Sequence, residues 1–133
     1  MTKFTDIPLP EPLLRAAADL NYQNPTTIQE LVMPWLLDND QDLIALAQTG
    51  TGKTAAFGFP ALTRTDIEIK AVQTLILCPT RELCIQIHND LMSYSKYMPR
   101  IKSAAIYGGA SIQKQKDTLR TGVQIVIGTP GRV

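Results

Sequence analysis

The sequence has little that would mark a secreted, membrane-spanning or strongly basic protein. It holds two cysteines, Cys78 and Cys84, and one histidine, too few for a disulfide framework or a zinc site. The net charge is +1, so no basic tail announces nucleic acid. No apolar run approaches the roughly 18 residues of a membrane span, and no signal peptide opens the chain. We therefore expect one cytoplasmic domain with reduced cysteines.

What is present is an alternation of helical and strand patterns. Prolines break up residues 1–10, which we expect to be an extended arm carrying Phe4. Apolar runs predict strands at about 42–47, 72–78, 103–107 and 123–127. Helical patterns predict five helices. The first covers about 11–20, the second begins at Thr26, and the third follows the glycine-bearing loop and ends at about 62. The fourth begins after Pro79 and ends at about 96, and the fifth covers about 111–120. This order favours an α/β fold, a parallel sheet with helices on both faces.

Several apolar patterns also predict which side chains are buried. The continuous run Leu75-Ile76-Leu77 suits a strand covered on both faces. Leu31 belongs to the apolar stripe of the helix after Thr26. In the helix at 111–120 we expect Ile112, Gln115 and Leu119 to face inward.

The segment from Ala47 to Thr54 has the pattern of a phosphate-binding loop. It follows an apolar run and precedes helix formers, and two glycines allow successive backbone N–H groups to surround an anion. The helix N-terminus adds further N–H groups, and Lys53 a mobile cation. One position departs from the strict phosphate-loop pattern, which has glycine where this chain has Ala47. The alternative interpretation is a simple glycine turn with a solvated lysine.

Two further residues have open interpretations. Gln29 stands three residues after Thr26, so on spacing alone a helix capping box is its favoured role. Arg81 is a cation in the first turn of a helix, where acids are preferred, which indicates either a bound anion or a pairing with a nearby acid. The polar loops 48–53, 79–82, 108–109 and 128–132 all follow predicted strands, at the sheet edge where such folds bind ligands.

Taken together, these motifs resemble the first half of the first RecA-like domain of a DEAD-box RNA helicase. The matching positions are Phe4, Tyr22-x-x-Pro25-Thr26-x-Ile28-Gln29, Ala47–Thr54, Pro79–Leu83, Gly108-Gly109 and Thr129–Arg132. That family normally has alanine at the position of Ala47, and glycine where this chain has Asn21. The resemblance implies a P-loop NTPase fold that is truncated at its C-terminus, with residues 1–38 forming an adenine-recognition arm.

The resemblance also implies an ATP site. Gln29 would read adenine and Phe4 would stack on it, while guanine presents the reverse hydrogen-bond pattern and is disfavoured. The phosphates would bind Gln48, Thr49, Gly50, Thr51, Gly52, Lys53 and Thr54. Lys53 and Thr54 would be the catalytic members, with Thr54 a ligand of ATP-bound Mg²⁺.

Six residues are implied to hold the backbone of single-stranded RNA without reading its sequence. They are Thr80, Arg81, Gly108, Gly109, Thr129 and Arg132. The whole protein would be an RNA-stimulated ATPase that locally unwinds short duplexes.

Some parts of such a motor are not found in this sequence. No acidic pair ends a predicted buried strand, although hydrolysis needs acids to fix Mg²⁺ and a water. We therefore expect this chain alone neither to hydrolyse ATP nor to unwind RNA. The alternative function is a catalytically silent fragment that acts by occupying nucleotide or RNA. Missing central strands would leave sheet edges open to self-association.

Overall fold

The computed structural model describes residues 2–133 and divides them into two compact units. The first unit contains the chain up to Arg64 together with Tyr94–Tyr97, and the second contains Thr65–Ser93 and Met98–Val133. Within residues 2–133, no helix combines the length and the apolar character that crossing a bilayer requires.

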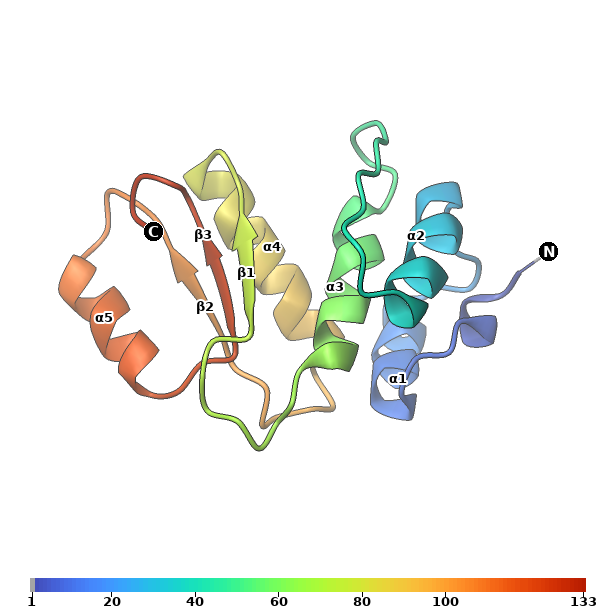
Figure 1. Ribbon diagram of the computed structural model, residues 1–133, viewed down its shortest axis with the longest axis horizontal. Helices are drawn as coiled ribbons and strands as arrows, with labels where there is room; N and C mark the ends of the chain where they lie inside the picture. Colours follow the sequence, from blue (N-terminus) through green and yellow to red (C-terminus); the bar gives the residue numbers. More distant parts are fainter. Residues whose placement is uncertain (1) are drawn as a thin grey trace. The chain divides into compact units, whose positions relative to one another are not determined.

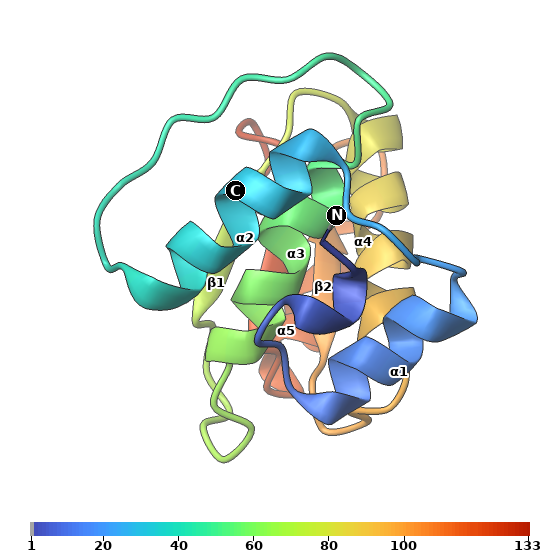
Figure 2. The ribbon, with the colours of Figure 1, turned by 90° about the vertical axis from the view of Figure 1, so that its right-hand side faces the viewer.

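The first unit is helical. Its elements are η1 (Phe4–Asp6), α1 (Glu11–Asp19), α2 (Thr27–Asp38) and α3 (Lys53–Arg64) (Figure 2). Helix α2 begins with the predicted capping box, since Thr26 Oγ1 accepts from the Gln29 N–H and Gln29 Oε1 accepts from the Thr26 N–H. Pro34 lies inside this continuous helix. The three helices expected before residue 64 are confirmed.

An aromatic cluster forms the core of this unit. Phe4 is only 1% exposed, and its ring centroid lies 5.7 Å from that of Tyr22 and 5.5 Å from that of Phe59. Tyr94 stacks on Phe59 with a centroid distance of 4.4 Å. The expectation of a wholly extended N-terminal arm is wrong, because Phe4–Asp6 is a short 3-10 helix whose aromatic ring is drawn into this core.

The predicted strand at 42–47 is also wrong. This segment has no regular structure and runs as an open loop between α2 and α3 (Figure 2). Ile44 and Leu46 are 88% and 90% exposed, so the apolar run is not buried. A strand needs a neighbour to pair its N–H and C=O groups, and no described strand pairs with this one.

The second unit contains a three-stranded parallel sheet. Its strands are β1 (Thr74–Leu77), β2 (Ser103–Ile106) and β3 (Ile125–Gly128), in the order β1-β3-β2. Helix α4 (Arg81–Tyr94) leads from β1 to β2, and α5 (Ile112–Arg120) leads back to β3. The two crossovers run in opposite directions along the sheet, so right-handed connections place the helices on opposite faces (Figure 1). The predicted α/β class is confirmed.

Burial within this sheet differs from the sequence pattern in two places. The central strand β3 is buried throughout, whereas Leu75 and Leu77 of the edge strand β1 are about half exposed, so the expectation that both faces of β1 are covered is wrong. Strands β1 and β2 each pair on one side only. Self-association through these edges stays a prediction.

Two helices likewise depart from their predicted apolar stripes. Gln115 is the buried residue of α5, while Ile112 and Leu119 are exposed. In α2, Leu31 is exposed although the predicted stripe includes it, whereas Val32 of the same stripe is buried, as is Met33 outside it. A stripe predicts which side of a helix is apolar, but the packing partner decides which of its members are covered.

Both cysteines are buried free thiols. The Cys84 S–H donates to the Ile127 carbonyl at 3.2 Å, and burial, reinforced by neighbouring Cys78, raises the pKa of Cys84 to about 11. A thiol with such a pKa stays protonated at neutral pH and is a packing group rather than a nucleophile. His88 hydrogen-bonds the Ser103 carbonyl at 3.2 Å. Among residues 2–133, no three His, Cys, Asp or Glu side chains gather as metal ligands.

Candidate functional site

The loop before α3 takes its shape from two glycines with left-handed backbones. Gly50 has a φ of +80° and Gly52 a φ of +82°, values that a side chain would disfavour. Lys53 and Thr54, whose charge and hydroxyl the sequence assigned to phosphate and Mg²⁺, are the first two residues of α3.

Side-chain donors hold the carbonyl groups of this loop. The Lys53 ammonium donates to the Ala47 carbonyl at 2.9 Å, and the Thr51 hydroxyl donates to the Gln48 carbonyl at 2.6 Å. The Thr26 hydroxyl donates to the Thr51 carbonyl at 2.7 Å. The carbonyls of Ala47, Gln48 and Thr51 are therefore hydrogen-bonded within the unit.

The backbone N–H groups of the same loop, in contrast, lack hydrogen-bond acceptors within the described residues. Among residues 2–133, no partner accepts a hydrogen bond from any backbone N–H of residues 48–53. Donors without partners, next to a helix N-terminus and a lysine, form the arrangement that proteins use to bind phosphate. The geometry of the predicted loop is therefore compatible with a bound anion.

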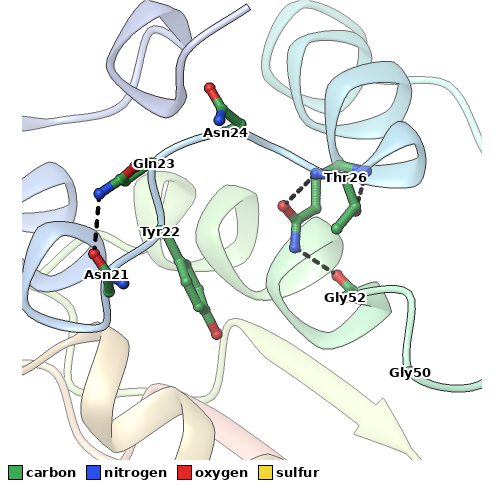
Figure 3. Close-up of a pocket in the computed structure, with 8 residues that line it drawn as sticks. Asn21, Tyr22, Gln23, Asn24, Thr26, Gly50 and Gly52 are labelled. Atoms are coloured by element: carbon green, nitrogen blue, oxygen red, sulfur yellow. Dashed lines mark hydrogen bonds between the residues drawn. The ribbon is translucent and has the colours of Figure 1, made fainter.

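Gln29 joins this loop to the turn that precedes α2. Its Nε2 donates to the Gly52 carbonyl at 3.2 Å, while its Oε1 accepts from the Thr26 N–H at 3.0 Å (Figure 3). Each end of the amide retains one further hydrogen-bonding position. The capping role favoured by spacing is therefore present, and it leaves the amide able to bind a second partner.

A pocket of about 420 Å³ opens beside this amide. Its lining residues come from the turn at 21–24, the start of α2 and the glycine loop: Asn21, Tyr22, Gln23, Asn24, Thr26, Gln29, Gly50 and Gly52 (Figure 3). Small-molecule sites commonly have volumes of about 300–1,000 Å³. Phe4 does not line the pocket but packs against Tyr22, which does.

In the second unit, Arg81 meets the loop that follows β2. As the first residue of α4, it places its guanidinium carbon 5.0 Å from the centroid of the Tyr107 ring. Gly109 has a φ of +83°, and a Cβ there would lie 3.3 Å from Arg81 Nη1. No acid pairs with Arg81 in the described part of the chain, so the alternative of a salt bridge is not observed.

The loop after β3 is joined to the same region. The Arg132 Nη1 donates to the Ala110 carbonyl and to Gln115 Oε1, each at 3.2 Å. The Thr129 N–H donates to the Ile106 carbonyl at 3.0 Å. The polar residues after β2 and β3 therefore lie together at the carboxyl ends of their strands, where the sequence placed them.

Thr80 has a local structural role at the start of α4. Its hydroxyl accepts from the Leu83 N–H at 3.2 Å, as expected of an N-terminal cap. A Cβ added at Gly108 would meet no atom within 4 Å. The six residues expected to bind RNA thus follow the three strands of the second unit, and one of them, Arg81, already belongs to helix α4.

Comparison with known proteins identifies the family. The DEAD/DEAH box helicase family model matches residues 26–133, which is most of the chain. The chain belongs to the DEAD/DEAH box helicase family. It is 47% identical over 132 residues to the ATP-dependent RNA helicase DeaD of Escherichia coli strain K12, covering 99% of this chain and 21% of that protein. It is 44% identical to the helicase CshA of Listeria monocytogenes, covering 100% and 25%.

Solved structures of the family share this fold. A DEAD box protein from Methanococcus jannaschii matches with a TM-score of 0.90 and 34% identity, covering 99% of this chain and 36% of that one. The Saccharomyces cerevisiae protein Dbp5, bound to RNA and ADP BeF3, matches with a TM-score of 0.88 and 33% identity, covering 99% and 33%. The chain thus spans about a fifth to a quarter of the curated helicases and a third of the solved ones.

The structure explains one departure from the family pattern. Asn21, which stands where the helicases usually have glycine, has a φ of +61°. Asparagine tolerates this left-handed conformation better than most side chains, and the Asn21 amide oxygen accepts a hydrogen bond from Gln23 Nε2 at 3.2 Å.

Three side chains support these loops in ways that the sequence pattern did not predict. Thr26 was interpreted only as a helix cap, yet its hydroxyl also binds the glycine loop. Tyr107 was placed in a strand without a role, yet it carries Arg81. The helical pattern predicted that Gln115 faces inward. A buried amide needs polar partners, so this position could have indicated its hydrogen bond to the Tyr107 carbonyl.

Proposed function

We propose that this chain carries the ATP-binding and single-stranded-RNA-binding surfaces of an ATP-dependent RNA helicase. The family supports this proposal, as do the names of its relatives and the RNA and ADP BeF3 in the Dbp5 structure. The observation that carries it is the hydrogen bond between Gln29 and Gly52, because it attaches an amide that can read a base to a loop that can bind phosphate.

The triphosphate of ATP would bind at the glycine loop. The N–H groups of residues 48–53 would donate to its β- and γ-phosphate oxygens, and the helix N-terminus of α3 would favour its negative charge. Lys53 would exchange the Ala47 carbonyl for a phosphate oxygen. Mg²⁺, when bound, neutralises phosphate charge, and the Thr54 hydroxyl is the ligand that this chain offers it.

The adenine ring would occupy the pocket beside Gln29. The free N–H of that amide would donate to N7 of adenine, and its free lone pair would accept from the exocyclic N6 amine. Guanine has an oxygen where adenine has this amine, so GTP would be rejected. Stacking of adenine on Phe4 would require that ring to leave the aromatic cluster, in which it is 1% exposed.

The test of this site is a comparison of ATP and GTP binding to the Gln29→Ala variant. We expect ATP affinity to fall roughly ten- to hundredfold, because two hydrogen bonds to the base are lost, while GTP affinity changes little. Competition against a fluorescent ATP analogue would measure both. Equal affinities of the wild-type chain for ATP and GTP would refute adenine recognition.

A matched variant separates this role from the capping role of the same residue. Gln29→Glu keeps an oxygen for the Thr26 N–H and so retains the capping box, but it has no donor for adenine. Because a carboxylate also loses the hydrogen bond to the Gly52 carbonyl at a buried position, we expect some loss of thermal stability together with a fall in ATP affinity. ATP affinity equal to that of the wild type would limit Gln29 to the helix cap.

The RNA backbone would bind the loops at the carboxyl ends of the three strands. Arg81 and Arg132 supply guanidinium groups, Thr80 and Thr129 supply hydroxyls, and Gly108-Gly109 allows close approach of a phosphate. Such contacts are with phosphate and sugar, so binding would not depend on base sequence. Arg81 supports this proposal because it has no acidic partner in the described part of the chain.

We also propose that the 133-residue chain binds ATP without hydrolysing it. In-line attack needs a water and a Mg²⁺ ion held by acids, and the pocket lining of the described residues includes no aspartate or glutamate. In a phosphate-release assay with saturating single-stranded RNA, we expect no turnover above the Lys53→Ala variant. RNA-stimulated release by the wild-type chain alone would contradict this.

A further inference from the structure

Gln115 is the buried residue of α5, and its amide is used at both ends. Gln115 is only 9% exposed, whereas the apolar residues Ile112 and Leu119 of the same helix face outward. Its Nε2 donates to the Tyr107 carbonyl at 3.0 Å, and its Oε1 accepts from Arg132 Nη1 at 3.2 Å. A buried amide with both ends satisfied stabilises one arrangement of its partners and makes others costly.

The two partners of Gln115 belong to different loops. Tyr107 begins the loop after β2, and Arg132 lies in the loop after β3. Arg132 Nη1 also donates to the Ala110 carbonyl at 3.2 Å, so Gln115 and Arg132 bind each other and each binds the backbone of residues 107–110. The ring of Tyr107 in turn carries the guanidinium of Arg81. Gln115 therefore contacts Arg132 directly and contacts Arg81 indirectly, through the backbone of Tyr107.

We propose that Gln115 is a positioning residue, which holds the loop of Tyr107 and the loop of Arg132 in the single arrangement that accepts an RNA backbone. This proposal rests on the proposed RNA-binding function. Gln115 does not itself contact RNA; it fixes where the Arg132 guanidinium points and where the Tyr107–Ala110 backbone runs. Without it, each binding event would first have to order both loops, and that ordering lowers affinity.

The first measurement needs no RNA. In Gln115→Met, an apolar side chain of similar length replaces the amide, and both hydrogen bonds are lost. We expect amide hydrogen exchange in the 133-residue chain to become faster at 107–110 and at 129–132 together. Faster exchange in only one of these segments, or in neither, would show that Gln115 does not join the two loops.

The second measurement asks whether Gln115 acts through Arg132. We expect Gln115→Met to weaken binding of a fluorescent single-stranded oligonucleotide roughly three- to tenfold, and to have little further effect when Arg132 is already alanine. A purely structural role would produce the same fold-change in both backgrounds. Equal fold-changes would therefore overturn the proposal.

Two controls exclude trivial causes. Gln113→Met alters the exposed face of the same helix, where Gln113 donates a hydrogen bond to Asp117, and should change neither loop exchange nor RNA affinity. Ile87→Val removes one buried methyl group from α4 and provides a comparable loss of stability without touching Gln115. If the wild-type chain binds no RNA, the proposed function fails, and the exchange result still decides whether Gln115 joins the loops.

Discussion

Replacing Gly52 by alanine is expected to abolish the preference for ATP over GTP. A Cβ at this position would lie 2.2 Å from Gln29 Nε2 and 3.1 Å from its Cδ, so the amide would have to move away from the loop. Because the displaced atoms are the end of a flexible side chain, the fold should persist while the base-reading group is lost. We expect ATP affinity to fall roughly a hundredfold, from this displacement and the strain at φ +82°, as measured by nucleotide competition.

Gly50→Ala is the matched control for this prediction. Gly50 has almost the same backbone conformation, with φ +80°, but a Cβ there would meet nothing within 4 Å. Its replacement therefore carries the backbone strain, about 1–2 kcal/mol, without moving Gln29. We expect weaker binding of both nucleotides with the ATP preference retained. If both variants kept the preference, or both lost it, the contact between Gly52 and Gln29 would not be the cause.

The helices of this chain could be predicted closely because their signals are local. The capping box at Thr26 marks the start of α2, and the hydroxyl of Thr80 does the same for α4. A cap is a contact between residues three apart, so its residues are adjacent in the sequence whatever the rest of the fold does.

The predicted strand at 42–47 failed because a strand depends on partners distant in the sequence. Its apolar run resembles that of β3, yet β3 is paired on both sides and buried while Ile44 and Leu46 are exposed. Hydrophobicity records a tendency to be covered, and pairing decides whether that tendency is realised. Leu75 and Leu77 at the sheet edge illustrate the same limit.

The candidate sites could be located from the sequence, but the links within them could not. The positions of the polar loops after strands predicted that Arg81, Gly109 and Arg132 lie at one edge of the sheet. The amide of Gln29 illustrates what remained hidden: spacing indicated a cap and resemblance indicated a base reader, and its hydrogen bond to Gly52 reconciles the two. Contacts of this kind join residues 23 positions apart and leave no periodic signal.

Replacing Gly109 by alanine is expected to weaken RNA binding about tenfold. The φ of +83° costs an alanine about 1–2 kcal/mol, and its Cβ would lie 3.3 Å from Arg81 Nη1, so the guanidinium beside the Tyr107 ring would have to shift by a few tenths of an ångström. The loop would then either relax to an ordinary backbone or hold Arg81 elsewhere, and both outcomes misplace a phosphate contact. Anisotropy of a labelled single-stranded oligonucleotide at low salt, where phosphate contacts are strongest, would measure the loss.

Gly108→Ala is the matched control, because the sequence pattern treats Gly108 and Gly109 as one motif. It shows whether the loss of RNA affinity is specific to Gly109 or follows from replacing either glycine. A Cβ at Gly108 meets nothing within 4 Å, and its φ is outside the left-handed region, so we expect RNA affinity within about twofold of the wild type. ATP affinity should be unchanged in both variants, since neither residue belongs to the pocket lining. Equal losses of RNA affinity would mean that phosphate approaches both glycines, and that support of Arg81 by Gly109 is not what the motif provides.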